Sequence, residues 1–323
     1  MKRLFLNGAI SAVLIWWLIS KTDPGTIAEL LAGANPAGMI IGLALILLAS
    51  VIASWRWRII ILAGAHEVPF AAVWSHILVG IFFNQVLPSS IGGDAVRIWR
   101  AHRSGLPLSL AASSVIIERA TGGAGLLLLV ALSLFLIPVI DIDPAFAIPL
   151  LGLLVAGSAG LWAIALLDKI PLPGILRHWS WISAIADLSR NFRSLVLQPR
   201  MALALILSAA ALQVIVALSV YAISISLHIS AGWFEHLILV PPALLMMMLP
   251  VSIAGWGVRE AALVYSFGFI GVSATDALAI SVSFGALSIL SGLPGSLIWL
   301  LSSKREQGEK KCATPADAEK PIL

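Results

Sequence analysis

Residues 84–103 read NQVLPSSIGGDAVRIWRAHR, and this stretch decides how the rest of the chain is organised. It interrupts an apolar segment with a proline and two glycines, and then introduces an aspartate and an arginine. The stretch also recurs. Residues 249–259 read LPVSIAGWGVR, and a shift of 162 positions lays them without a gap on residues 87–97, with seven of eleven positions identical. A Pro, a Gly and an Arg in register indicate a duplicated half whose copied element forms the working site.

The composition is that of a polytopic membrane protein. Of the 323 residues, 60% are apolar and 11% are charged, and the mean hydropathy is +1.02, which excludes an ordinary water-soluble domain. The net charge of +4 does not indicate nucleic-acid binding, because the basic residues flank apolar runs. The single Cys312 excludes a disulfide framework and a thiolate metal site. Run 4–19 has two tryptophans and no small-x-small cleavage site after it, so we expect an uncleaved first span.

The apolar runs repeat along the chain in the same order. Segments 38–54, 71–87 and 109–138 correspond, at the 162-residue offset, to segments 200–216, 233–249 and 271–300. A helix needs about 20 residues to cross the hydrocarbon, and the runs around the two motifs are cut at their Pro–Gly centres. Hydropathy alone would count seven or eight spans.

The distribution of Lys and Arg indicates whether the two motif segments cross the membrane or form re-entrant hairpins. If 71–104 and 233–270 are hairpins that enter and leave on one side, Lys21 is the one basic residue in the external loops. If 71–87 crossed fully, the basic loop 168–200 would be external, which the positive-inside rule disfavours. Each half then has three crossings, so the halves are inverted and their hairpins meet near the midplane, as in many secondary transporters.

The sequence therefore predicts an all-α polytopic membrane protein of two inverted repeats, with about six full spans plus two re-entrant helical hairpins. We expect repeats at 1–140 and 141–301, a disordered cytoplasmic tail at 302–323, and both termini on the cytoplasmic side of a bacterial inner membrane. Loop 168–200 has apolar residues at helical spacing among three arginines. It is expected to form an amphipathic helix on the anionic cytoplasmic leaflet.

The residue types of the first motif fit an anion site. Pro88 blocks continuation of the incoming helix, and Gly92 and Gly93 let the backbone turn and leave room for a ligand. A half-helix that starts near Gly93 would point free N–H groups at a cavity. Arg97, one turn on, could grip a phosphate through two parallel N–H bonds, and Asp94 could hold the guanidinium while the site is empty.

The second motif repeats this arrangement from the other side. Gly255, Gly257 and Arg259 correspond to the first set, Trp256 replaces Asp94, and Glu260 follows the arginine. Glu118 and Arg119 enter the long apolar helix after the first hairpin. Ionisable groups at membrane depth indicate function, although simple kinks and purely structural ion pairs are the alternatives. Arg56 and Arg58 are expected to be interface anchors. The histidines show no metal spacing, so we expect neither metal nor cofactor.

Two other functional classes compete with transport. An intramembrane enzyme acting on a lipid-linked substrate would need acid–base groups, but the sequence has no HExxH, no nucleophile elbow and no pair of membrane aspartates. We therefore expect a protein that is not an enzyme. An accessory protein of an envelope-lipid pathway, associated with biosynthetic enzymes, is the other alternative.

Three strings, FFNQVLPSSIGGDAVRIWRA at 82–101, ERATGG at 118–123 and PVSIAGWGVREAA at 250–262, resemble the lysylphosphatidylglycerol synthase transmembrane-region family of flippase-like proteins. The resemblance spans residues 4–301. It implies movement of a lipid between leaflets, with an anionic, polyprenyl or isoprenoid-type lipid such as a hopanoid as partner. The chain ends 22 residues after Leu301, so we expect a stand-alone membrane domain without the aminoacyl-transferase domain of the full synthase. The residues that match the family's motif positions are Asn84, Pro88, Gly92, Gly93, Asp94, Arg97, Glu118, Arg119, Gly255, Trp256, Gly257, Arg259 and Glu260.

The resulting hypothesis is a lipid transporter with a duplicated phosphate site at the midplane. Arg97 and Arg259, with the half-helix N-termini, would bind the lipid phosphate alternately from each side. Glu118, Arg119 and Glu260 would organise the cavity or couple a proton.

Overall fold

The structure, a computed structural model, describes residues 16, 20, 22–87, 92–137, 144–169, 180–247 and 256–312, apart from the side chains of 144, 180–187 and 303–312. Within these ranges all regular structure is helical, which confirms the predicted class. The short turns η2 and η3 cover Pro144–Phe146 and Leu167–Lys169. The α-helices are α2 (Pro24–Ala32), α3 (Pro36–Ala63), α4 (Phe70–Val86), α5 (Gly92–Arg103), α6 (Leu108–Leu136), α7 (Ala147–Leu166), α8 (Ser180–Val196), α9 (Pro199–Ser226), α10 (Trp233–Met247), α11 (Val258–Gly268) and α12 (Ala274–Cys312).

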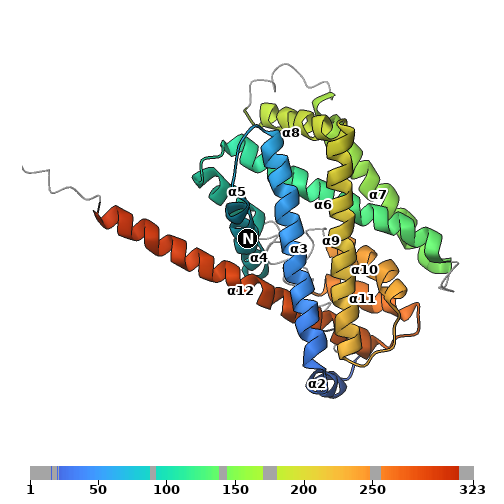
Figure 1. Cartoon of the computed structure of the whole chain (residues 1–323). Helices are drawn as coiled ribbons and strands as arrows, with labels where there is room; N and C mark the ends of the chain where they lie inside the picture. The colour runs from blue at the N-terminus through green and yellow to red at the C-terminus, as the bar shows by residue number, and fades with distance from the viewer. Residues whose placement is uncertain are drawn as a thin grey trace, which may run out of the picture.

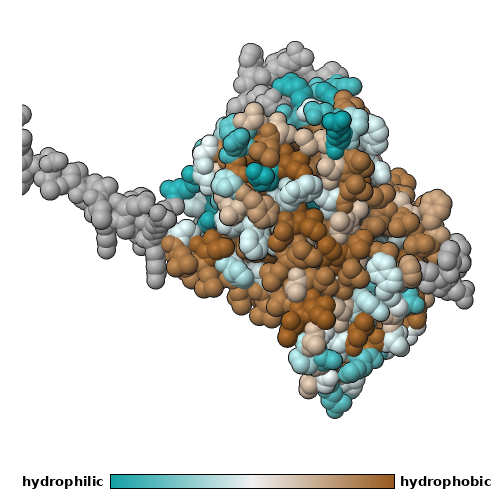
Figure 2. All heavy atoms as spheres, viewed as in Figure 1, coloured by the Kyte–Doolittle hydropathy of each residue, from teal (hydrophilic) through white to brown (hydrophobic). Residues whose placement is uncertain are grey.

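Five of these helices, α3, α6, α7, α9 and α12, are long and apolar enough to cross a membrane. Figure 2 shows an apolar surface over the middle of the molecule, with hydrophilic residues concentrated toward the α8 end and the α2 end. The chain is thus a polytopic membrane protein. The further span predicted at 4–19 lies outside the described residues except for Trp16, so the total of about six stays a prediction.

Helices α3 and α9, which the 162-residue shift relates, run antiparallel. The backbone N–H of Asn35, before α3, donates to the carbonyl of Ser226 at the end of α9 (2.9 Å), and the Ser226 hydroxyl donates to the Asn35 carbonyl (2.6 Å). Proline at the first turn of each helix starts it without losing a hydrogen bond. The two related helices therefore point in opposite directions, as an inverted duplication requires (Figure 1).

Each half contains a helical hairpin after this first long helix. In the first hairpin, His76 near the start of α4 contacts Arg100 near the end of α5, and Asn84 near the end of α4 contacts Gly93. In the second, the ring of His236 on α10 packs against Phe267 on α11. The four helices have 17, 12, 15 and 11 residues, fewer than a full crossing needs. Because α3 and α9 are antiparallel, the hairpins start from opposite ends of the molecule (Figure 1).

The two halves interlock through these hairpins. Helix α4 packs against α12, and α10 packs against α6, so the first helix of each hairpin lies against the last helix of the other half. The α4–α12 crossing is close: a Cβ added at Gly295 would collide with the carbonyl of Leu78. The hairpin tips at 88–91 and 248–255 lie outside the described residues. The depth of the hairpins in a membrane and the repeat boundary at 140/141 stay predictions.

Helix α8 lies within loop 168–200, which confirms the predicted helix. Its apolar face packs against a different partner from the lipid surface that we expected. The helix lies across one end of the bundle (Figure 1), and Leu188, Phe192 and Leu195 are buried against Ile60 and Leu205. This part of the face therefore covers protein and not the lipid surface. Helical spacing predicts that a face is apolar, but it does not predict what covers that face.

Helix α12 extends into the tail. It continues through residues 302–312 to Cys312, and the disorder expected for the tail at 302–323 stays a prediction. This segment reads SSKREQGEKKC and contains strong helix formers such as Lys, Arg, Glu and Gln, which extend a helix already nucleated inside the bundle. Residues 313–323 lie outside the described part of the chain.

Candidate functional site

The close approach of α4 and α5 sets the position of Arg97. A Cβ added at Gly93 would collide with the carbonyl of Gly80, and a Cβ added at Gly80 would lie 2.5 Å from Arg97 Cδ. The two glycines thus let the helices touch and let the arginine lie across α4. The Gly93 N–H donates to Asn84 Oδ1 at 3.0 Å. The expectation of a free N–H at Gly93 is therefore wrong, because the amide of the facing helix takes this donor.

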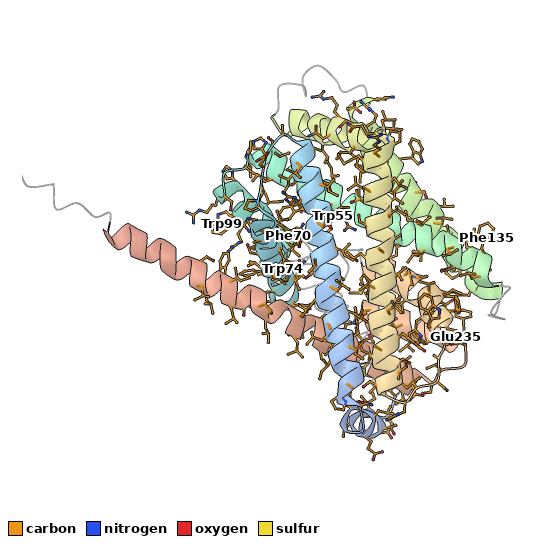
Figure 3. The ribbon with its side chains drawn as sticks, in the orientation of Figure 1. Trp55, Phe70, Trp74, Trp99, Phe135 and Glu235 are labelled. Atoms are coloured by element: carbon orange, nitrogen blue, oxygen red, sulfur yellow. The ribbon has the colours of Figure 1, made fainter. Side chains whose placement is uncertain are left out.

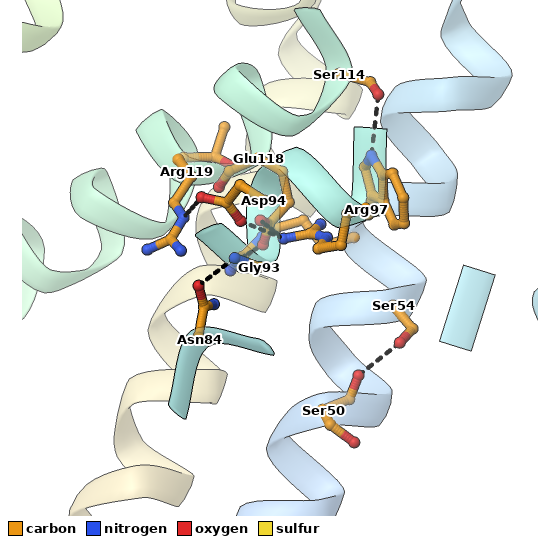
Figure 4. A network of polar contacts seen from close by, with 12 residues as sticks. Ser50, Ser54, Asn84, Gly93, Asp94, Arg97, Ser114, Glu118 and Arg119 are labelled. Atoms are coloured by element: carbon orange, nitrogen blue, oxygen red, sulfur yellow. Dashed lines mark hydrogen bonds and ion pairs between the residues drawn. The ribbon is translucent and has the colours of Figure 1, made fainter. Parts of the chain in front are cut away.

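Arg97 belongs to a network of five charged side chains, of which Arg119 is 38% exposed and the other four are buried. Figure 4 labels all of them except Arg56. Its Nη1 lies 3.3 Å from both Asp94 Oδ1 and Glu118 Oε2. Asp94 Oδ2 accepts from Arg119 Nε at 2.7 Å, and Glu118 Oε1 accepts from Arg56 Nη2 at 2.5 Å. Every carboxylate oxygen of the network is therefore engaged by an arginine.

The network has a net charge of +1, because it contains three arginines and two carboxylates. Arg56 and Arg97 are 3% and 6% exposed. Four of their nitrogen atoms, Nε and Nη1 of Arg56 and Nε and Nη2 of Arg97, have no hydrogen-bond partner among the described residues. Leaving buried charged donors unpaired is costly. The arrangement is therefore suited to an anion that would accept these hydrogen bonds.

Trp57 supports Arg97 from one side. Its ring is fully buried, its centroid lies 4.4 Å from Arg97 Cζ, and its Nε1 donates to Ser114 Oγ at 3.0 Å. The hydrogen bond fixes the indole, and the indole face stabilises the guanidinium by a cation–π interaction. Figure 3 shows the neighbouring Trp55 as a separate side chain on α3; it is 46% exposed and fits a membrane-belt role.

A cavity of about 370 Å³ adjoins the network. It is lined by α3, α4, α5 and α6 of the first half and by α9 and α12 of the second. Its charged lining consists of Arg56, Arg97, Glu118 and Arg119. Its uncharged polar lining consists of Ser50, Asn84, Gln85, Gln213, Ser288 and Ser291. A polar cavity between two halves, in the middle of apolar helices, is typical of transporter substrate sites.

The second motif forms a separate and closed cluster. Glu260 accepts two hydrogen bonds from Arg259, and its Oε2 accepts from the Gly257 N–H at 2.6 Å. Ser281 and the ring of Trp256, at 4.5 Å from Arg259 Cζ, complete the cluster. Gly257 has a φ of +85°, which favours glycine at this helix start. Glu260 thus occupies the N-terminus of α11, where an external anion would otherwise bind.

The predicted site residues consequently fall into two groups. The cavity lining contains Asn84, Arg97, Glu118 and Arg119. Asp94 forms ion pairs with Arg97 and Arg119. Gly93 allows the close contact between α4 and α5. Gly92 starts α5 beside Leu87. Trp256, Gly257, Arg259 and Glu260 form the closed cluster and are not part of the cavity lining. Pro88 and Gly255 lie outside the described residues. The structure therefore does not bring Arg97 and Arg259 to one site.

Sequence reasoning missed Arg56 and Gln213. The interpretation of Arg56 as an interface anchor is wrong, because it is buried and paired with Glu118. One signal was available: Arg56 and Arg58 are two positions apart and so point to opposite sides of a helix, and Arg58 instead donates to the Val68 carbonyl. Nothing local marked Gln213 on α9. The described residues contain no group of three or more His, Cys, Asp or Glu side chains suited to a metal.

Comparisons with known proteins agree with the resemblance noted in the sequence. A family model described as "Lysylphosphatidylglycerol synthase TM region" matches residues 4–295, which include both copies of the motif. A UPF0104 membrane protein of Methanocaldococcus jannaschii is 32% identical over 112 residues. That alignment covers 34% of this chain and 33% of the relative, so the chain matches about a third of the relative's length.

Proposed function

Because the chain belongs to the lysylphosphatidylglycerol synthase TM region family, we propose that it is a lipid transporter. It binds a phosphate-bearing headgroup in the cavity beside the α4–α5 hairpin and moves that lipid between leaflets. The membrane is the bacterial inner membrane, and both termini face the cytoplasm. The family supports a role in lipid handling, and the site supports the anionic headgroup.

One observation carries the proposal: the buried arginines Arg56 and Arg97 have four nitrogen atoms without partners beside a cavity of about 370 Å³. A phosphate group has several acceptor oxygens and forms charge-assisted, often bidentate bonds with guanidinium groups. Its binding would also reduce the uncompensated charge of a buried network. An apolar or cationic ligand would leave these donors unsatisfied.

The position of the cavity supports movement of the ligand and not binding alone. Four of its helices come from one half and two from the other. A displacement of one half against the other would therefore open the cavity alternately toward each side, the usual mechanism for inverted repeats. The carboxylates Asp94 and Glu118 are engaged by arginines on both oxygens. We assign them the role of holding the cations, and we assign no catalytic step.

The test is leaflet exchange of a fluorescent phosphatidylglycerol in proteoliposomes, with wild type, Arg97→Gln and Arg58→Gln compared. Arg58 lies on α3, two positions after Arg56, and is not part of the cavity lining, so Arg58→Gln controls for the loss of one cation. We expect exchange with wild type and Arg58→Gln, and at least tenfold slower exchange with Arg97→Gln. Absence of exchange of any anionic lipid by folded wild-type protein would overturn the proposal and favour an accessory role.

A further inference from the structure

The cavity lining contains further polar groups that the binding of a phosphate by the arginines does not use. Gln213 of α9 is 8% exposed, and its carboxamide makes no hydrogen bond within the described part of the chain. Gln85 of α4 likewise has no such partner there, and both line the cavity. A polar group that lines a cavity without a protein partner is available to a ligand. These groups are therefore suited to a ligand with uncharged hydrogen-bonding groups next to its phosphate.

The hydroxyl groups of Ser288 and Ser291 of α12 add acceptors to the cavity lining. Ser288 Oγ donates to the Phe284 carbonyl at 2.7 Å, and Ser291 Oγ donates to the Ser288 carbonyl at 2.8 Å. Because each hydroxyl donates its hydrogen to a carbonyl of its own helix, its oxygen lone pairs remain available to accept a hydrogen bond from a ligand. A ligand hydroxyl, which both donates and accepts, complements the serines and the carboxamides together.

The charges of the cavity disfavour a cationic headgroup. Among the described residues that line the cavity, Glu118 is the one carboxylate, and both of its oxygens accept from arginines. Asp94, behind it, is engaged in the same way. An ammonium group would therefore enter a network of net charge +1 without an available carboxylate partner.

From these three observations we infer the chemical class of the lipid, and the inference rests on the proposed function of the same site. The headgroup is a phosphate ester that continues into neutral hydroxyl-bearing groups, as in a glycerol or sugar phosphate, and it carries net negative charge. The phosphate binds Arg56 and Arg97, and the hydroxyl groups bind Gln85, Gln213 and the serines of α12. Aminoacylated lipids and other lipids with an ammonium group are poor ligands.

The experiment measures equilibrium binding of short-chain lipids to purified full-length protein in neutral detergent. The probes are dihexanoyl phosphatidylglycerol, dihexanoyl phosphatidic acid, dihexanoyl lysyl-phosphatidylglycerol and soluble glycerol phosphate. We expect phosphatidylglycerol to bind about tenfold more tightly than phosphatidic acid, and lysyl-phosphatidylglycerol to bind at least tenfold more weakly than phosphatidylglycerol. Soluble glycerol phosphate that binds as tightly as phosphatidylglycerol would identify a soluble ester as the ligand and overturn the assignment to a lipid.

The variant Gln213→Leu separates the neutral part of the headgroup from the phosphate. It should weaken phosphatidylglycerol about tenfold and leave phosphatidic acid unchanged, whereas Gln198→Leu, at the exposed start of α9, should affect neither. Gln85→Leu provides the same test if Gln213→Leu does not fold. Equal binding of phosphatidylglycerol and phosphatidic acid, or tight binding of lysyl-phosphatidylglycerol, overturns this inference. If that binding still depends on Arg97, the proposed function remains in place. If no phosphate lipid binds, the proposed function itself fails.

Discussion

In the first copy of the repeated motif, Arg97 shares two carboxylates with two further arginines, whereas in the second copy Arg259 has the carboxylate of Glu260 as its counter-charge. The first cluster has net charge +1, donors without partners and an adjoining cavity. The second is neutral, and its carboxylate also caps the helix that follows. One backbone element thus supports an arginine cluster beside a cavity in one half and a closed ion pair in the other.

The difference arises from a few side chains around the shared arginine. At the 162-residue shift, Asp94 corresponds to Trp256, and Glu118 corresponds to Ile280. Ile280 is fully buried in an apolar cluster of the described residues that also contains Leu263 and Phe267 of the second hairpin. The second copy is therefore packed within the apolar core, whereas the first copy adjoins the cavity. A duplicated scaffold can keep its geometry while one copy provides rigidity and the other provides chemistry.

Neutralising the carboxylate of each cluster should give the largest effects. Glu118→Gln and Glu260→Gln each leave a buried arginine without its counter-charge, which costs about 3–5 kcal/mol. We expect both variants to unfold at a clearly lower temperature in detergent. Added dihexanoyl phosphatidylglycerol should raise the unfolding temperature of both variants, because both keep the arginines of the cavity and ligand binding at a hundred times Kd contributes about 2.7 kcal/mol to the native state. The increase should be larger for Glu118→Gln, where the lipid phosphate replaces the lost counter-charge, and an equal increase in both variants would contradict the assignment of the closed cluster.

Removing an arginine of the open cluster should weaken lipid binding more than it affects folding. Arg56→Gln loses charge-assisted hydrogen bonds to the ligand, each worth about 1.5–3 kcal/mol, or roughly 10–150-fold in affinity. Arg58→Gln is the matched control and should change the affinity by less than about twofold. Titration of the short-chain anionic lipid checks this prediction. An unchanged affinity for Arg56→Gln would remove this residue from the site.

Filling the space under Arg97 should have an intermediate effect. In Gly80→Ala the new methyl group meets the Arg97 side chain at Cγ and Cδ and displaces it. We expect the affinity for the anionic lipid to fall by about tenfold, the scale of one weakened charge-assisted hydrogen bond. Gly152→Ala, on α7, introduces the same methyl group into open space and should leave binding unchanged. If the two variants bind the lipid equally, the position of Arg97 does not depend on Gly80.

The smallest effects should come from the aromatic rings that cover each arginine. Trp57→Phe removes the hydrogen bond to Ser114 and weakens the cation–π contact, which costs about 1 kcal/mol for each. A small loss of affinity, of at most about fivefold, should accompany a modest decrease in thermal stability. Trp256→Phe should lower stability by about 1 kcal/mol or less and leave binding unchanged. A loss of binding in Trp256→Phe would show that the two clusters are coupled.

The sequence by itself determined the membrane class, the order of the helices and the inversion of the two halves, because hydropathy and internal repetition are properties of the chain read in order. It also determined the pairing of Arg97 with Asp94, since residues three apart on a helix are neighbours. The tertiary structure alone decided that Arg56 meets Glu118 across 62 positions, that Gln213 of the other half reaches the same cavity, and that Glu260 closes its own motif. The physical reason is that helical periodicity defines the faces of each helix, while the packing of one half against the other selects which faces meet.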